Sequence, residues 1–359
     1  MRIAQVAPLF ESVPPRRYGG TERIVHWLTE ALVSMGHDVT LFATGDSDTS
    51  ARLVPVRPRA ERFARNFEVN NAPYARMIEM VAQSADDFDV IHCHIDFHPF
   101  SVLSRQRTPF LTTLHGRMDQ AWVSDIYAMF PDAPLVSISD SQRRAAPGLN
   151  WTGTVLHGMP EDTLVPMLKQ QGYFAFLGRI SPEKGILDAI RIARACGVKL
   201  KVAAKIGEED AEFHEAVVAP LLRGDGVEFV GEIDDSQKPD FLSGAKALLF
   251  PIDWPEPFGL VMIEAMACGC PVIAYRRGSV PEVVEDGLTG FVVENVDEAV
   301  AACGRLPALD RARVRARFEA RWTSARMAQD YLGLYRKLID GSRVTAAPNL
   351  RRVLAILAG

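Results

Sequence analysis

The most constraining feature of this sequence is the stretch PEPFGLVMIEAMACGCPV at residues 255–272. Prolines and a glycine come first, and good helix formers follow over about 259–268. Gly269 then ends the predicted helix, and a proline opens an apolar segment typical of a buried strand. The pattern therefore places Glu256 on a loop and Glu264 inside the helix that the loop enters.

The start of this predicted helix is a candidate anion site. The backbone amides of Phe258, Gly259 and Leu260 have no intrahelical partner there, and the positive end of the helix dipole lies beside them. Eight residues of helix rise about 12 Å, which is comparable to the distance from the ribose to the sugar of a sugar nucleotide. The segment can act as a clamp, with ribose hydroxyls at Glu264, a diphosphate at the amides and sugar hydroxyls at Glu256. An ordinary helix with an acidic residue near its start is the alternative interpretation.

Composition excludes several other classes of protein. The 359 residues suggest two domains, and the net charge of −5 argues against a general nucleic-acid binder. The five cysteines include no CxxC pair, so they indicate neither a disulfide framework nor a structural zinc site. No apolar run approaches the roughly 20 residues of a membrane-spanning helix, and the first residues lack a signal-peptide core. We therefore expect a cytoplasmic protein.

The first residues predict a strand–helix–strand unit of a parallel sheet. A short apolar strand at Ile3–Ala7 is followed by a loop that ends in Gly19 and Gly20, a helix over about 21–35 and a strand at Asp38–Ala43. The two glycines put free amides at the helix start, on the sheet edge where such folds bind ligands. The loop is not GxGxxG, so the dinucleotide-binding fingerprint is absent.

Histidines mark two further strands of this half. His92 and His94 alternate on the strand Asp89–Ile95 and share one face, with His98 close behind. A metal needs three or four ligands, and the sequence does not say where further ones would come from, so we expect no metal. His115 ends the apolar strand PFLTTLHG beside a glycine, where open α/β sheets place their chemistry. A neutral histidine that only caps the strand is the plainer alternative. The last strand of this half is expected near 154–159, and we assign no role to His157 within it.

The strand–helix pattern restarts after a polar, proline-bearing segment at about 161–171, which we take as a domain boundary. The predicted strands of the second half lie near 173–178, 199–204, 227–230, 245–250, 271–274 and 290–293. The first of them runs into GRISPEKG, in which Arg179 and Lys184 precede a helix. Two cations at a sheet edge suit a diphosphate, although a solvated loop is the alternative.

The motifs together resemble one family of enzymes. The Glu256–Glu264 segment resembles the signature of retaining glycosyltransferases of the GT-B fold, family 4, and GRISPEKG is similar to the element whose Arg and Lys hold the donor pyrophosphate in that family. TLHG resembles the segment whose histidine lies beside the reacting sugar. The resemblance covers nearly the whole chain and is strongest over residues 172–293. It implies an α/β protein with two Rossmann-like domains that face each other across a cleft.

The resemblance also implies a division of labour along the chain. Residues 1–165 would bind the acceptor, residues 166–321 would bind the nucleotide-sugar donor, and a helix within 322–359 would pack back on the first domain. The implied catalytic residues are His115, Arg179, Lys184 and Glu256. The implied donor contacts are Gly19, Gly20, His94, Arg179, Lys184, Gly231, Glu256, Phe258, Gly259, Leu260 and Glu264.

The reaction implied by the resemblance is transfer of a hexose to an acceptor hydroxyl with retention of configuration. The opening MRIAQVAPL with its later YGGTE resembles enzymes that glucosylate small molecules such as pterins, or act in polysaccharide assembly, so UDP-glucose is the preferred donor. Protein cations take up the charge of the leaving diphosphate, so neither a metal nor a cofactor is expected. The acceptor, a small molecule or a growing glycan, and the oligomeric state are not determined.

Three other functions are compatible with parts of the pattern. A sugar-nucleotide epimerase also uses two facing domains, and a protein that only binds the donor would keep the motifs without turnover. A nicotinamide oxidoreductase is disfavoured by the missing GxGxxG. The Arg-rich segment 52–65 is interpreted as a solvated face or the rim of an anionic acceptor site rather than a lipid-binding surface, so we expect at most peripheral membrane contact.

Overall fold

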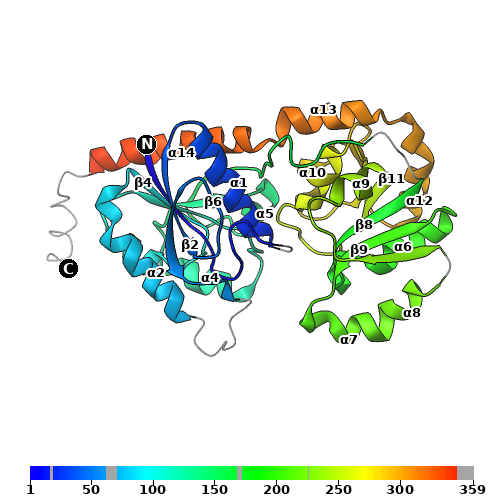
Figure 1. Ribbon diagram of the computed structural model, residues 1–359, viewed down its shortest axis with the longest axis horizontal. Helices are drawn as coiled ribbons and strands as arrows, with labels where there is room; N and C mark the ends of the chain where they lie inside the picture. Colours follow the sequence, from blue (N-terminus) through cyan, green and yellow to red (C-terminus); the bar gives the residue numbers. More distant parts are fainter. Residues whose placement is uncertain (17–18, 62–70, 168–171, 225, 346–359) are drawn as a thin grey trace.

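The computed structural model describes residues 1–16, 19–61, 71–167, 172–224 and 226–345. These residues form two parallel sheets, one of seven strands and one of six (Figure 1). In the first sheet the order is β3-β2-β1-β4-β5-β6-β7. Its strands are β1 (Arg2–Val6), β2 (Asp38–Thr44), β3 (Arg52–Arg57), β4 (Val90–Cys93), β5 (Phe110–Thr113), β6 (Leu135–Ser137) and β7 (Trp151–Thr154).

The second sheet repeats the same plan with different residues, in the order β10-β9-β8-β11-β12-β13. Its strands are β8 (Tyr173–Arg179), β9 (Leu200–Lys205), β10 (Val227–Gly231), β11 (Ala245–Phe250), β12 (Val272–Tyr275) and β13 (Gly290–Val293). We call the first sheet with its helices the first domain and the second sheet with its helices the second domain.

Helices cover both sheets. Those of the first domain are α1 (Gly20–Ser34), α2 (Asn71–Gln83), α3 (Phe100–Leu103), α4 (Ala121–Ala128) and α5 (Asp140–Arg144). Those that follow β8 are α6 (Ile186–Ala195), α7 (Ala211–Phe213), α8 (Ala219–Leu222), α9 (Lys238–Ser243), α10 (Leu260–Ala267), α11 (Val280–Val283), α12 (Val296–Arg305), α13 (Arg311–Arg321) and α14 (Ser324–Thr345). Helix α1 buries Ile24, Leu28 and Leu32 completely, the apolar stripe that its spacing predicts.

Each sheet has a point where the strand order reverses, and these points position the site. In the first sheet the reversal lies between β1 and β4, and in the second it lies between β8 and β11. Ligands of open parallel sheets bind beyond the carboxyl ends of the strands at such points. The loops that leave β1, β4, β8 and β11 carry the glycine pair, His94 with His98, the GRISPEKG turn and the segment before α10, respectively, while His115 follows the neighbouring strand β5.

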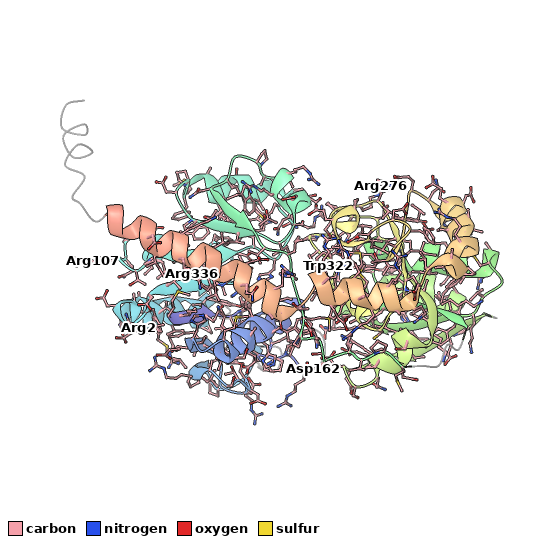
Figure 2. All side chains as sticks on the ribbon, turned by 90° about the horizontal axis from the view of Figure 1, so that it is seen from above. Arg2, Arg107, Asp162, Arg276, Trp322 and Arg336 are labelled. Atoms are coloured by element: carbon pink, nitrogen blue, oxygen red, sulfur yellow. The ribbon has the colours of Figure 1, made fainter. Side chains whose placement is uncertain are left out.

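Helices α13 and α14 join the domains a second time. Figure 1 shows α14, coloured orange to red, crossing from the second domain over the first. Viewed from above, Trp322 lies at the break between the two helices (Figure 2). At this break the amide of Met159 donates to the Trp322 carbonyl at 2.8 Å, and the amide of Ser324 donates to the Met159 carbonyl at 2.9 Å. The chain therefore passes between the domains at two adjacent places that are bonded to each other.

The structure differs from the sequence-based expectation at three places in the first domain. The segment Arg52–Arg57 is a strand, β3, which tolerates Pro55 because it lies at the edge of the sheet. Helix α2 was not predicted. The last strand, expected near 154–159, is Trp151–Thr154. The remaining part of the Arg-rich segment, from residue 62, lies outside the described residues.

The close crossing at Met159 predicts a strong effect of a small substitution. A Cβ added to Gly158 would lie 2.1 Å from the Thr323 carbonyl oxygen, a backbone atom that cannot move alone. We expect Gly158→Ala to lower the free energy of unfolding by about 1–3 kcal/mol or more, as other overpacked sites do. Gly148→Ala is the control, because a Cβ there meets no atom within 4 Å. Urea unfolding measures both variants, and equal stabilities would contradict the crossing.

Candidate functional site

A cavity of about 510 Å³ lies between the two domains, at the facing carboxyl edges of their sheets. This volume is within the range of small-ligand pockets, which is roughly 300–1,000 Å³. The first domain contributes Gly19, Gly20 and His115 to its lining, while the second contributes the Arg179–Lys184 turn and the segment Glu256–Glu264. The structure therefore brings most of the predicted site residues to one cavity.

The N-terminus of α10 forms one wall. Gly259 adopts a left-handed φ of 79°, and a Cβ on it would lie 2.7 Å from the Met262 side chain. Among the described residues, the backbone amides of Phe258, Gly259 and Leu260 have no hydrogen-bond acceptor. A Cβ on Gly20 would lie 3.7 Å from Leu260, so the glycine loop of the first domain faces this helix start. Free amides at a helix N-terminus are a ready site for an anion.

Lys184 and Glu256 form an ion pair beside these amides. Lys184 Nζ lies 2.7 Å from Glu256 Oε2, and the Trp254 indole N–H donates to the same oxygen at 2.9 Å. The ammonium also lies 4.5 Å from the centre of the Trp254 ring, a cation–π contact. The lysine and the carboxylate are thus held in place by an aromatic side chain that the sequence analysis did not single out.

Arg179 is surrounded by carboxylates. Its two terminal nitrogens pair with Glu209 at 2.6 Å and Glu183 at 2.9 Å, and its Nε lies 3.2 Å from Asp210. Burial opposes ionisation of Glu183, but hydrogen bonds from Ser181 and Arg179 outweigh it and lower its pKa. The Glu209 side chain is 63% exposed, so it is the partner that can leave most easily. An incoming anion could replace Glu209 on the guanidinium.

A chain of charges connects the domains near Glu264. Lys238 Nζ lies 2.7 Å from Glu264 and 2.9 Å from Asp235, and Asp235 in turn pairs with Arg23 of the first domain. The Glu264 side chain is only 5% exposed, and Lys238 provides the compensating charge that a buried carboxylate needs. Arg23 and Lys238 line the cavity, and neither was predicted.

The histidines form a layered group behind the cavity. His115 lines the cavity, and its Nε2 lies 2.9 Å from His94 Nδ1. His94 is buried behind it and does not line the cavity, and its ring lies 4.1 Å from the ring of His92. Burial lowers the pKa of His115 to about 3 and that of His94 well below its usual value. Both imidazoles are neutral near pH 7.

Two other predictions about cavity residues have mixed outcomes. Gly231 ends β10 with a left-handed φ of 79°, but it does not line the cavity, whereas the next two residues do. His157, to which we assigned no role, lines the cavity and stacks on His115 with ring centres 5.3 Å apart. Trp254, two residues before Glu256 in WPEPFG, was an available signal, because aromatic side chains commonly line small-ligand pockets.

The described residues contain neither a cluster of metal ligands nor a membrane-spanning helix. No three His, Cys, Asp or Glu side chains in this part of the chain are grouped so that they could hold a metal ion. No helix within the same residues has the length and apolarity needed to cross a membrane.

Two facing parallel α/β sheets, with cations, carboxylates and free helix amides at their common cleft, define a glycosyltransferase of the GT-B fold. Comparison with known families agrees. Residues 166–319 match the family "Glycosyl transferases group 1", and residues 18–149 match "Glycosyltransferase Family 4". The chain belongs to this family of retaining, nucleotide-sugar-dependent glycosyltransferases.

Three similar proteins illustrate the range of the family. A glycogen synthase of Mycobacterium tuberculosis is 26% identical over 94% of this chain and 95% of its own. A phosphatidyl-myo-inositol mannosyltransferase of Mycobacterium leprae is 26% identical over 92% and 93%. The crystal structure of Anabaena HepE in complex with UDP and glucose has a TM-score of 0.73, with 17% identity over 94% of this chain and 100% of that one. The solved structure supports the fold.

The buried histidines predict a dependence of stability on pH. Burial lowers the pKa of four histidines, His92, His94, His115 and His157. In the unfolded chain the same side chains have their ordinary pKa, near 6.5. Below that pH the unfolded state binds more protons, so stability should fall as pH falls, by up to about 1.4 kcal/mol per pH unit for each histidine. Urea unfolding between about pH 7 and pH 5 measures this slope. His157→Gln removes one of these groups, so it should lower the slope of unfolding free energy against pH by nearly the contribution of one proton, about 1.4 kcal/mol per pH unit. An unchanged slope would contradict the neutral state of His157.

Proposed function

We propose that this glycosyltransferase moves a hexose, with glucose from UDP-glucose as the first candidate, to the hydroxyl of a small molecule or a growing glycan, and that it needs no metal. The observation that carries the proposal is the meeting of Arg179, Lys184 and the free amides of α10 at one cavity. HepE, with the same fold, binds UDP and glucose, and a related chain is a glycogen synthase. The relationship to a mannosyltransferase keeps mannose as the second candidate.

The proposed donor position follows the side chains and backbone amides along α10 and the loop before it. The ribose hydroxyls bind Glu264, the diphosphate lies at the amides of Phe258–Leu260 between Arg179 and Lys184, and the hexose reaches Glu256 and His115. The hexose lies nearest the first domain, so the acceptor enters from residues 1–165. Under this proposal, residues 166–321 hold the donor.

Charge stabilisation is the proposed source of catalysis. The leaving diphosphate gains negative charge as the glycosidic bond breaks, and two cations together with oriented amides stabilise that charge without reorganising. Carboxylates hold these cations in position, Glu209 on Arg179 and Glu256 on Lys184. Donor binding would exchange the exposed Glu209 for phosphate oxygens. The leaving phosphate then helps to deprotonate the acceptor hydroxyl on the same face of the sugar, which retains the configuration.

The first experiment is a thermal-shift panel of nucleotide sugars, followed by mass spectrometry of reactions with candidate acceptors. A glycosylated product together with free UDP supports the proposal. A changed sugar nucleotide without any acceptor would indicate an epimerase instead. Binding without turnover on every acceptor would indicate a protein that only binds the donor.

Loss of either cation should slow the chemical step. We expect Arg179→Ala and Lys184→Ala each to lower kcat by about 10²–10³-fold, the usual cost of removing one preorganised donor. Arg191→Ala is the matched control, because Arg191 is an exposed arginine on α6 that pairs with Asp188 away from the cavity. Thermal melts verify the fold. Near-normal turnover in both site variants would defeat the phosphate assignment.

The ribose assignment is tested with a pair of ligands. Glu264→Gln should weaken UDP binding by about tenfold, since a hydrogen bond to a charged group contributes roughly 1.5–3 kcal/mol. UDP lacking its ribose hydroxyls should bind the wild-type protein about equally weakly, with no further loss in the variant. Calorimetry gives the four dissociation constants. Additive losses would show that Glu264 does not contact the ribose.

A further inference from the structure

A continuous chain of hydrogen bonds connects the cavity to the C-terminal helix α14. His115 Nε2 lies 2.9 Å from His94 Nδ1, and His94 Nε2 lies 2.9 Å from the Gln5 side-chain oxygen. The Gln5 amide nitrogen then donates to the Tyr335 hydroxyl at 3.2 Å. His94 and Gln5 are almost completely buried, and Tyr335 is completely buried, so water does not compete for these bonds.

The direction of this chain is decided at Tyr335, which has one proton and two neighbours. His92 Nδ1 lies 2.7 Å from the hydroxyl oxygen, whereas the Gln5 nitrogen lies at 3.2 Å. A contact of 2.7 Å is typical of an O–H donor and shorter than most N–H donors give, so the hydroxyl donates to His92 Nδ1 and accepts from the Gln5 side chain. Gln5 must therefore turn its amide nitrogen toward Tyr335 and its oxygen toward His94.

The orientation of Gln5 determines the protons of both histidines that follow. Burial keeps His94 neutral, so it carries a single N–H, and the facing Gln5 oxygen requires that proton on Nε2. His94 Nδ1 is then an acceptor, which requires the proton of neutral His115 on its own Nε2. His115 Nδ1 is left with a lone pair, and among the described residues that atom has no hydrogen-bond partner.

We propose that Tyr335 and Gln5 are positioning residues that hold His115 in the Nε2–H tautomer, so that its Nδ1 accepts a hydrogen bond from a hydroxyl of the sugar in the cavity. The last clause rests on the proposed function, whereas the tautomer itself does not. If the chain ran in the opposite direction, every proton would move to the other nitrogen, and His115 would present an N–H to the sugar. Helix α14 thus acts on the site from behind the first sheet, through side chains that do not touch the substrate.

The tautomers can be measured without any substrate. Long-range proton–nitrogen NMR spectra of protein labelled with ¹⁵N-histidine distinguish Nδ1–H from Nε2–H rings, and single His→Gln variants assign the signals. Near neutral pH the wild-type protein should show Nε2–H at both His94 and His115. Tyr335→Phe removes the acceptor of the Gln5 amide nitrogen, so Gln5 can turn this nitrogen toward His94. The protons of His94 and His115 then move to Nδ1, and the Nδ1–H form should appear at His115.

Tyr331→Phe is the matched control. Tyr331 lies one turn earlier on α14 and is equally buried. Its hydroxyl bonds Thr113 at 2.9 Å, and Thr113 in turn lies 2.7 Å from His92 Nε2, so Tyr331 reaches the far nitrogen of His92 and does not bond Gln5. Both variants lose one buried hydroxyl, but only Tyr335→Phe should change the His115 tautomer. Gln5→Met provides a second test of the same link if Tyr335→Phe does not fold. An unchanged His115 tautomer in the folded variants, or Nδ1–H in the wild-type protein, would overturn the proposal.

Turnover separates this proposal from the proposed function. Tyr335→Phe should lower kcat by about fivefold relative to Tyr331→Phe, the contribution of one neutral hydrogen bond. KM for the donor should change less, because the diphosphate and ribose contacts are untouched. A changed tautomer with unchanged kcat would support the positioning role of Tyr335 and would remove His115 from the proposed sugar contacts.

Discussion

Parallel pairing of the strands is the constraint on which the site depends. In a parallel sheet every strand ends at the same edge, so loops that are distant in the chain meet there. The reversal between β1 and β4 places the loop with the glycine pair beside β4 and β5, which are followed by His94 and His115, and the reversal between β8 and β11 brings together the GRISPEKG turn and the start of α10. Because the two edges face each other, one cavity collects groups from both domains.

Carboxylates pair with several of the cations that line this cavity. Arg179, Lys184 and Lys238 pair with Glu209, Glu256 and Glu264, respectively. Cations without partners would repel one another and destabilise the fold, whereas paired cations are held in position and can exchange partners. Glu209 is exposed, so a ligand can displace it from Arg179. Glu264 is nearly buried, so it stays paired with Lys238.

Helix α14 has a structural and a chemical connection to the first domain. The chain passes between the domains twice, near Met159 and again at the start of α14. Hydrogen bonds between these two places hold them together. The middle of α14 buries Tyr331 and Tyr335 against the histidines of β4 and the end of β5. A helix that closes the back of the sheet therefore also completes the hydrogen bonds of side chains that lead to the cavity.

Local patterns were sufficient to predict much of this protein. The prolines and glycines around α10, the alternation of His92 and His94, and the cations of GRISPEKG depend on a few neighbouring residues, so the second sheet, the helix start and the family could be derived from them. Strand β3 and helix α2 were missed, since a proline and several arginines hide a strand that only an edge position permits.

Contacts between distant residues could not be derived in this way. The pairing of Arg23 with Asp235 depends on how the two domains meet. The tryptophan over Lys184 and the burial of His94 behind His115 depend on which strands are neighbours within each sheet. The sequence by itself determined which chemical groups are present and on which elements they lie, because periodicity and turn chemistry are local. Only the tertiary structure decided which charges pair and which nitrogen of a buried histidine carries the proton, because both depend on partners that lie on other elements, from about 20 to more than 300 residues away in the chain.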